Sequence, residues 1–236
     1  MAIQSLDNIA YEILELYRVN RVDDSDIDLR LIKERIRTWR TILLKQYFTG
    51  VRSVEQIYVQ DLGCVDIEKI DPVECPEVTS TDYIFKTVDK VPQPIELRGN
   101  LMFTRIGPIN KVAINFDYIN YNQIQYTSFN RFTSNIIKSF YRNDYLYFYT
   151  DSKKCVDHLK LIEQVNVQGI FQDPEEVYDI VKTDTTLCFD ESVVYPISDD
   201  IKNKIIDIVT KEMLNKHRMP EDKINDGDNM NLNVGK

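Results

Sequence analysis

The chain has 236 residues and a net charge of −9, with 43% hydrophobic and 28% charged residues. This balance is typical of a folded globular protein, and the length leaves room for one large domain or two small ones. No run approaches the ~18 apolar residues of a membrane span, and the first residues have neither the basic segment nor the apolar core of a signal peptide.

The first 50 residues predict two helices in a hairpin. Apolar residues recur at helical spacing in SLDNIAYEILELYRV, where Ser5 is the expected N-cap. After the linker NRVDDSD, Ser25 and Asp28 form a capping-box pattern ahead of a second helix, which runs to about Tyr47 and ends near Gly50. The short connection favours an antiparallel pair.

The second helix carries a concentrated positive charge. Residues 29–52 contain seven basic side chains and one acidic one, a net charge of +6 that leaves −15 for the rest of the chain. Four of the basic residues share one stripe of the helix: Arg30, Lys33, Arg37 and Arg40. Three interpretations stay open, namely a solvated face paired with carboxylates of the same chain, a contact with an acidic protein, and a contact with nucleic acid.

Residues 57–171 predict short β-strands. The candidate runs are 57–70, 83–88, 94–97, 101–106, 136–142, 145–150 and 161–171. Asn143 and Asp144 stand between two aromatic runs and indicate a tight hairpin, whereas 118–130 is expected as a loop or a short helix. Because no long helix separates the strands, we predict an antiparallel sheet or a small barrel.

Aromatic residues gather in the same region. Residues 116–149 hold seven of the fourteen tyrosines and five of the ten phenylalanines. Alternation along the strand 145–149 places its three tyrosines on one face, and Leu146 and Phe148 on the other. Core packing with cross-strand pairs, a subunit interface and a nucleic-acid stacking platform are the three interpretations.

Helical patterns return late in the chain. Asp173 followed by Pro174 is typical of a helix start and predicts a short helix to about Val181. Ser198 is expected to cap a final helix, whose apolar face consists of Ile201, Ile205, Ile208 and Met213.

The predicted fold class is therefore α+β, with a C-terminal tail that we expect to be disordered in isolation. The expected parts are a helical hairpin (1–52), a central β-rich domain (53–172), a C-terminal helical segment (173–217) and the tail (218–236).

Residues that carry chemistry are few. The four cysteines lie far apart with no C-x-x-C pair, and His158 and His217 are the only histidines. The seven glycines stand singly, so no glycine-rich phosphate-binding motif occurs. We therefore expect no catalytic residue, no metal and no cofactor. A hydrolase built from carboxylates distant in the sequence is the remaining enzymatic alternative.

The order of the segments gives a family resemblance. The chain contains IAYEILELYRVNRVDDSDIDLRLIKERIRTWRTILLKQ, then YVQDLGCVDIEKID, then VPQPIEL and RIGPI, and then CFDESVVYPISDDIKNKIIDIVTKEML. Over most of residues 6–215 this order resembles a virion structural protein of crAss-like bacteriophages. The resemblance implies a subunit of the head–tail connector, an adaptor ring stacked on the portal, with no catalytic residues.

From this resemblance we expect a non-enzymatic subunit that self-associates into a ring, binds the portal protein and other connector or tail ring proteins, and surrounds passing DNA without sequence-specific binding. Its expected location is the virion tail or neck, after assembly in the host cytoplasm and without membrane contact. The expected contact residues are Arg30, Lys33, Arg37, Arg40, Ile201, Ile205 and Ile208. The alternative is a nucleic-acid-binding or DNA-packaging protein that uses the basic stripe.

Overall fold

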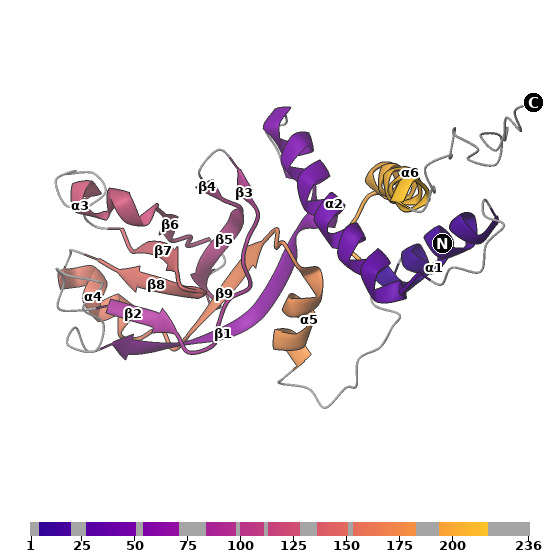
Figure 1. Ribbon diagram of the computed structural model, residues 1–236. Helices are drawn as coiled ribbons and strands as arrows, with labels where there is room; N and C mark the ends of the chain where they lie inside the picture. The colour runs from indigo at the N-terminus through magenta and orange to yellow at the C-terminus, as the bar shows by residue number, and fades with distance from the viewer. Residues whose placement is uncertain are drawn as a thin grey trace, which may run out of the picture.

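A β body and a layer of helices lie side by side along an elongated molecule (Figure 1). The computed structural model describes residues 5–19, 27–50, 54–70, 84–97, 100–110, 113–127, 136–150, 153–182 and 194–216. Helices from both ends of the chain flank a mostly antiparallel sheet that is nearly closed into a barrel. The predicted α+β fold class is confirmed, and the predicted tail 218–236 lies outside the described residues.

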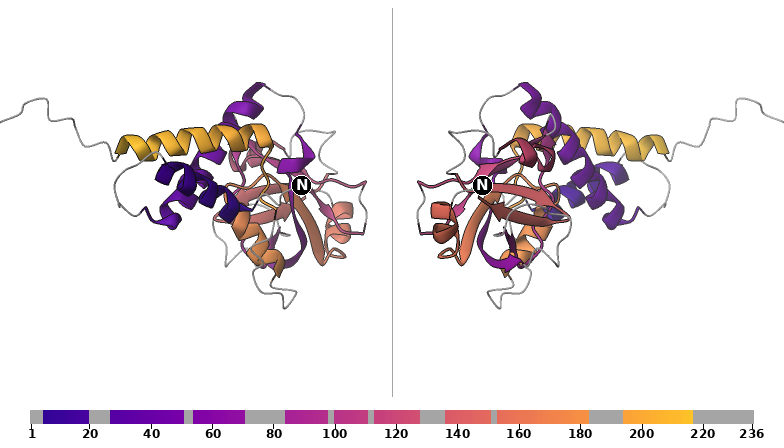
Figure 2. Two further views of the ribbon diagram at one scale, coloured as in Figure 1. Left: turned by 90° about the vertical axis from the view of Figure 1, so that its right-hand side faces the viewer. Right: turned by 90° about the vertical axis from the view of Figure 1, so that its left-hand side faces the viewer.

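The helical layer combines the two ends of the chain (Figure 2). α1 (Leu6–Val19) and α2 (Leu29–Gly50) form the predicted hairpin, and α6 (Asp199–Lys216) packs against both. Their inner faces share one hydrophobic cluster, in which Ile36 and Ile205 are fully buried. α6 therefore completes a core that α1 and α2 begin.

The first two helices begin at side-chain caps. The Oγ of Ser5 accepts a hydrogen bond from the backbone N–H of Asn8 at 3.2 Å, as predicted for an N-cap. In α2, a carboxylate oxygen of Asp28 accepts from the backbone N–H of Arg30 at 2.9 Å. The capping-box prediction placed Asp28 inside the first turn of the helix, and this position was wrong. α2 starts directly after Asp28, so Asp28 is itself the N-cap. Ser25 lies outside the described residues.

Within the described ranges, seven strands form one sheet in the order β5-β9-β1-β2-β8-β7-β6, antiparallel except between β6 and β7. Their bounds are β1 (Gln60–Ile70), β2 (Ile84–Thr87), β5 (Phe103–Pro108), β6 (Asp117–Tyr118), β7 (Lys138–Arg142), β8 (Tyr145–Tyr149) and β9 (Gln164–Gly169). β3 (Glu96–Leu97) and β4 (Asn100–Leu101) pair separately. Each predicted run overlaps at least one of these strands, but Gln56–Tyr58 form a short 3-10 helix, η1, in place of the expected strand start. β6 was not predicted, and its Tyr118 belongs to the segment expected as a loop or a short helix.

β1 is shared between two parts of the sheet. Its residues up to Asp66 pair with β9, and from Ile67 onward it pairs with β2. The register with β9 shifts between Asp61 and Cys64, where Gly63 has a φ of 72°. Glycine adopts this left-handed conformation without a Cβ clash, and a bulge of this kind increases the local twist. β1 can therefore curve the sheet towards closure.

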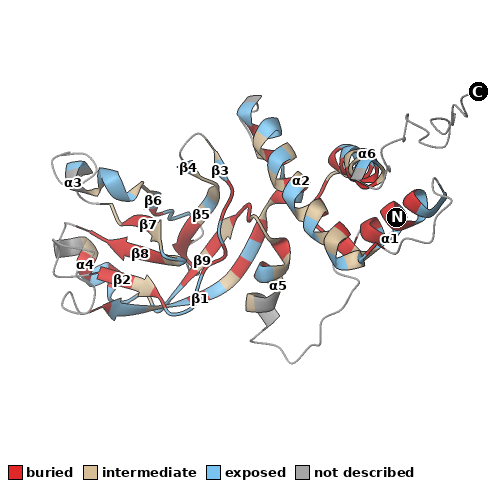
Figure 3. Ribbon diagram, in the orientation of Figure 1, coloured by how far each residue is buried: buried red, intermediate tan, exposed pale blue. Residues whose placement is uncertain are grey.

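The two outer strands of the sheet, β5 and β6, nearly meet. The backbone N–H of Phe116 donates to the carbonyl oxygen of Ile106 at 2.7 Å, and the N–H of Ile106 donates to Oδ1 of Asn115 at 2.9 Å. Gly107 is required here, because a Cβ at this position would overlap the carbonyl oxygen of Ile114. Buried residues fill the inside of the sheet and the inner faces of the helices (Figure 3).

The predicted hairpin is confirmed between β7 and β8. Asn143 has a φ of 50° and Asp144 a φ of 67°, and successive positive φ values are the signature of a type I′ turn. Leu146 and Phe148 face the barrel interior, whereas the three tyrosines of β8 join a second cluster on the opposite face. The predicted alternation along this strand is thus also confirmed.

Short helices fill the connections. Part of the segment 118–130 forms η2 (Tyr121–Gln123) and α3 (Ile124–Thr127), in agreement with the short-helix expectation. α4 (Lys153–Leu159) was not predicted, whereas α5 (Pro174–Lys182) begins at the predicted proline. The Oγ of Ser198 accepts from the N–H of Ile201 at 3.4 Å and caps α6 as expected. No helix in the described ranges is both long and apolar enough to cross a membrane.

Candidate assembly surfaces

Much of the positive charge of α2 is neutralised inside the subunit. Lys33 forms an ion pair with Asp7 of α1. Arg35 approaches Glu212 of α6 at 3.5 Å, and the indole N–H of Trp39 donates to the same carboxylate at 3.0 Å. α2 is therefore joined electrostatically to both of the other long helices, as the first interpretation of its basic stripe requires.

Arg37 joins α2 to the start of α5. Its Nε lies 3.5 Å from Asp173, and its Nη2 donates to Glu175. Burial opposes the charge of Arg37, but the two carboxylates hold its pKa above the ordinary value. Asp173 also caps α5, because its Oδ1 accepts from the backbone N–H of Glu175 at 3.0 Å. The same two acids thus start α5 and tie it to the helical layer.

Arg40 is completely buried where the helical layer meets the β body. Its Nε donates to the carbonyl oxygen of Pro196 at 3.1 Å, and its Nη1 donates to that of Phe171 at 2.9 Å. The guanidinium carbon also lies 5.5 Å from the ring centroid of Tyr195. Burial lowers the pKa of Arg40, but a guanidinium stays charged in proteins. One buried cation therefore joins α2, the end of β9 and the segment that leads into α6; we call it the Arg40 joint.

The predicted contact residues differ in accessibility. Arg30 is exposed and Ile208 is half-buried, whereas Ile201 and Ile205 lie in the hydrophobic cluster of the helical layer. The partly buried Lys33 and Arg37 and the buried Arg40 already have the partners described above. A contact with another protein stays a prediction for this set. Its accessible members are Arg30, which has no ion pair among the described residues, and Ile208.

Tyr195 gives the Arg40 joint a pH dependence. Burial raises its pKa to about 12, although Arg40 partly opposes this shift, and the ordinary value is 10.0. Folding favours the protonated phenol, so this contribution is complete below pH ~10 and is lost as the pH rises towards ~12. We expect this group to remove about 2–3 kcal/mol from the free energy of unfolding over that window.

Urea unfolding from about pH 8 to about pH 12 measures this loss. Tyr195→Phe should lose less stability with pH than the wild type, since it has no phenol to titrate. At neutral pH the substitution should cost little, because the Tyr195 hydroxyl has no hydrogen-bond partner among the described residues. Parallel pH curves for the two proteins would contradict the assignment.

The aromatic region packs mainly against itself. The rings of Phe140 and Tyr147 stack with centroids 4.9 Å apart, and Phe116 meets Phe148 edge-on at 5.7 Å. These contacts match the interpretation as core packing with cross-strand pairs. An exposed exception is Tyr126, which is 68% accessible.

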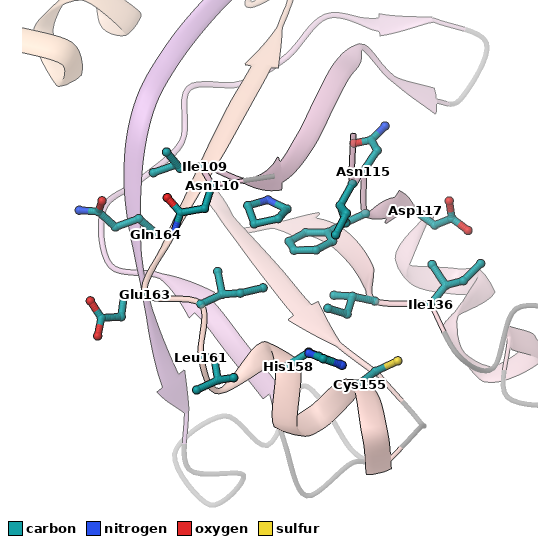
Figure 4. Close-up of a pocket in the computed structure, with 15 residues that line it drawn as sticks. Ile109, Asn110, Asn115, Asp117, Ile136, Cys155, His158, Leu161, Glu163 and Gln164 are labelled. Carbon is teal, nitrogen blue, oxygen red and sulfur yellow. The ribbon is translucent and has the colours of Figure 1, made fainter. Parts of the chain in front are cut away.

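A groove lies in the β body beside α4 (Figure 4). α4 is at the end of the molecule opposite to α1 and α6 (Figure 1). It has a volume of about 800 Å³ and lies between the end of β5, the start of β9 and α4. Leu161 and Ile114 line it and are 80% and 42% exposed. Polar side chains also line it, including Asn110, Asp117, His158, Glu163 and Gln164. No sequence pattern announced this groove, because its lining comes from separate segments.

These features describe a subunit of two parts. A charged joint fixes a helical layer to a β body, and a groove lined by apolar and polar side chains lies in the β body. Such a groove is a candidate surface for contact with another molecule.

The comparison with known proteins gives the particular family. The family model described as phage tail ring protein 2, of the crAss-like ring proteins, matches residues 8–230, and the chain belongs to this family. It is also 27% identical over 192 residues to Ring protein 2 of Bacteroides phage crAss001. The aligned residues cover 79% of this chain and 80% of that relative. The resemblance to crAss-like phage ring proteins is confirmed, and it places the chain among structural components of the phage virion.

Proposed function

We propose that the chain is a non-enzymatic subunit of a closed homo-oligomeric ring in the head–tail connector. The portal protein binds on one side of the ring, and other connector or tail ring proteins bind on the other. The family supports a ring subunit. Ring closure requires two different surfaces on each subunit, and a subunit built of a helical layer and a β body is asymmetric enough to supply them.

The neutralised charge of α2 is the observation that carries the role around DNA. Lys33, Arg35 and Arg37 face carboxylates of their own subunit, and Arg40 is buried. These cations are engaged inside a chain whose net charge is −9. A ring of such subunits repels the phosphate backbone, so DNA passes through the channel without binding to its wall.

The accessible members of the predicted contact set, Arg30 and Ile208, are the proposed contacts with the portal. Arg30 stands at the start of α2, and Ile208 lies in the middle of α6. Both belong to the helical layer, so this layer faces the portal and the β body spaces and seals the ring. Assembly in the host cytoplasm then delivers the ring to the tail or neck of the virion.

The mass measured by light scattering tests whether the chain forms a ring. A salt titration of duplex DNA binding tests whether the channel wall leaves DNA unbound. The purified chain, alone and mixed with its portal protein, should give the mass of a closed ring and of a ring–portal complex. Duplex DNA should show no measurable binding at physiological salt. A monomer in both mixtures would overturn the ring. DNA binding that weakens linearly with log salt would instead favour the nucleic-acid-binding alternative, which the family does not support.

A further inference from the structure

The groove beside α4 presents apolar surface that the described part of the subunit leaves exposed. Leu161 and Ile114 are large, exposed and lie at the same hollow. Scattered apolar residues on a surface need no explanation, but a hollow lined by both apolar and polar side chains is the kind of surface that binds other molecules. Its volume of about 800 Å³ is within the range of sites that enclose a ligand. The groove can therefore hold a short stretch of polypeptide.

The chain contains a segment of matching chemistry. Residues 229–234 are Asn-Met-Asn-Leu-Asn-Val, a strict alternation of amide and apolar side chains. In an extended backbone, alternate side chains point to opposite sides. Met230, Leu232 and Val234 then form one apolar side, and the asparagines form a polar one. Such alternation is typical of a strand that buries one side against a partner, and extended peptides bind grooves in this way.

The position of the groove and the length of the linker bear on which copy supplies the segment. α6 ends at Lys216 in the helical layer, whereas α4 and the groove lie at the opposite end of the molecule (Figure 1). Residues 217–229 span at most about 45 Å when extended, which is about the diameter of a compact chain of this size. A linker of this length can cross from one subunit to another, and in a ring each subunit meets its neighbour through a different surface.

We propose that residues 229–234 of one subunit bind in extended form in the groove of the next subunit around the ring. This inference rests on the proposed ring function and specifies its self-association surface. The contact is heterologous, because a tail on one copy meets a groove on the other, and repetition of such a contact closes a ring. The tethered segment acts at high effective concentration once the subunits are adjacent, and so strengthens a ring held by other contacts as well.

Photo-cross-linking of the full chain locates the segment. Leu232→p-benzoylphenylalanine, in an equal mixture of ¹⁵N-labelled and unlabelled protein, should link to peptides from 108–117 or 155–164. About half of the linked pairs should combine the two isotopes, since a contact between copies pairs them at random. Asn231→p-benzoylphenylalanine is the matched control on the opposite side of the segment and should give several-fold fewer groove links. Links outside the groove, or links within single copies only, would overturn the proposal.

Mixing two variants tests the direction of the contact. Leu161→Asp in the groove and Leu232→Asp in the tail should each raise the dissociation constant of self-association at least tenfold, whereas Asn231→Asp should leave it unchanged. At a concentration at which neither variant forms rings alone, an equal mixture of the two should form pairs but no rings, since only one groove and one tail remain compatible. If the wild type forms rings and Leu232→Asp forms them equally well, this proposal fails and the ring function stands. If the wild type stays monomeric at every concentration, both fail.

Discussion

Arg40→Ala is expected to lower the free energy of unfolding by about 3–4 kcal/mol. The substitution leaves the carbonyl oxygens of Phe171 and Pro196 without their charged donor, at about 1.5–3 kcal/mol for each charge-assisted bond. It also leaves a cavity in the place of a long, fully buried side chain. Removal of a buried charge offsets part of this loss, and Nη2, which has no partner among the described residues, contributes to that offset.

Two further variants separate these contributions in urea unfolding. Arg40→Met restores most of the volume but not the hydrogen bonds, so it should lose about half as much stability as Arg40→Ala. Arg30→Ala is the matched control, because it removes the same side chain from an exposed position of the same helix, and it should change stability by less than about 0.5 kcal/mol. If Arg40→Ala lowered the free energy of unfolding as little as Arg30→Ala does, the Arg40 joint would not stabilise the fold.

Local signals explain why so much of the architecture could be predicted. The cap at Ser5, the proline at the start of α5 and the Asn143–Asp144 turn each depend on residues within a few positions of one another. Alternation along β8 likewise needs only a single strand to sort its side chains between two faces. None of these features requires knowledge of what packs against the element.

The roles of the charged and apolar stripes could not be obtained in the same way. A helical wheel places Arg30 and Arg40 in one stripe, yet one is exposed and the other is buried against the end of β9. The difference arises because Arg40 lies where α2 meets Phe171 and Pro196, and the pattern of a single helix does not encode which other segments pack against it. An apolar face shows that a helix is covered, but not whether its own chain or a partner covers it.

Ile205 and Ile208 of α6 illustrate this limit, and they give the second large effect. Both belong to the face predicted to contact a partner, but Ile205 is 0% exposed inside the hydrophobic cluster, whereas Ile208 is half-buried. Ile205→Ala should therefore lower the free energy of unfolding by about 2–5 kcal/mol, the range for truncating a well-packed isoleucine. Deletion of 196–236 would remove the same core residue, so it would unfold the helical layer rather than isolate a contact.

Ile208→Ala should cost less than about 1 kcal/mol of stability, because part of the side chain is already solvated. If Ile208 contacts the portal, as we propose, the same substitution should weaken the ring–portal complex about tenfold while the free subunit unfolds almost normally. Urea unfolding and portal binding, measured on both variants, separate a core residue from a contact residue, since stability and affinity then change independently. A large stability loss in Ile208→Ala with unchanged portal binding would assign the whole apolar face of α6 to the subunit core, and would leave the exposed Arg30 to carry the contact.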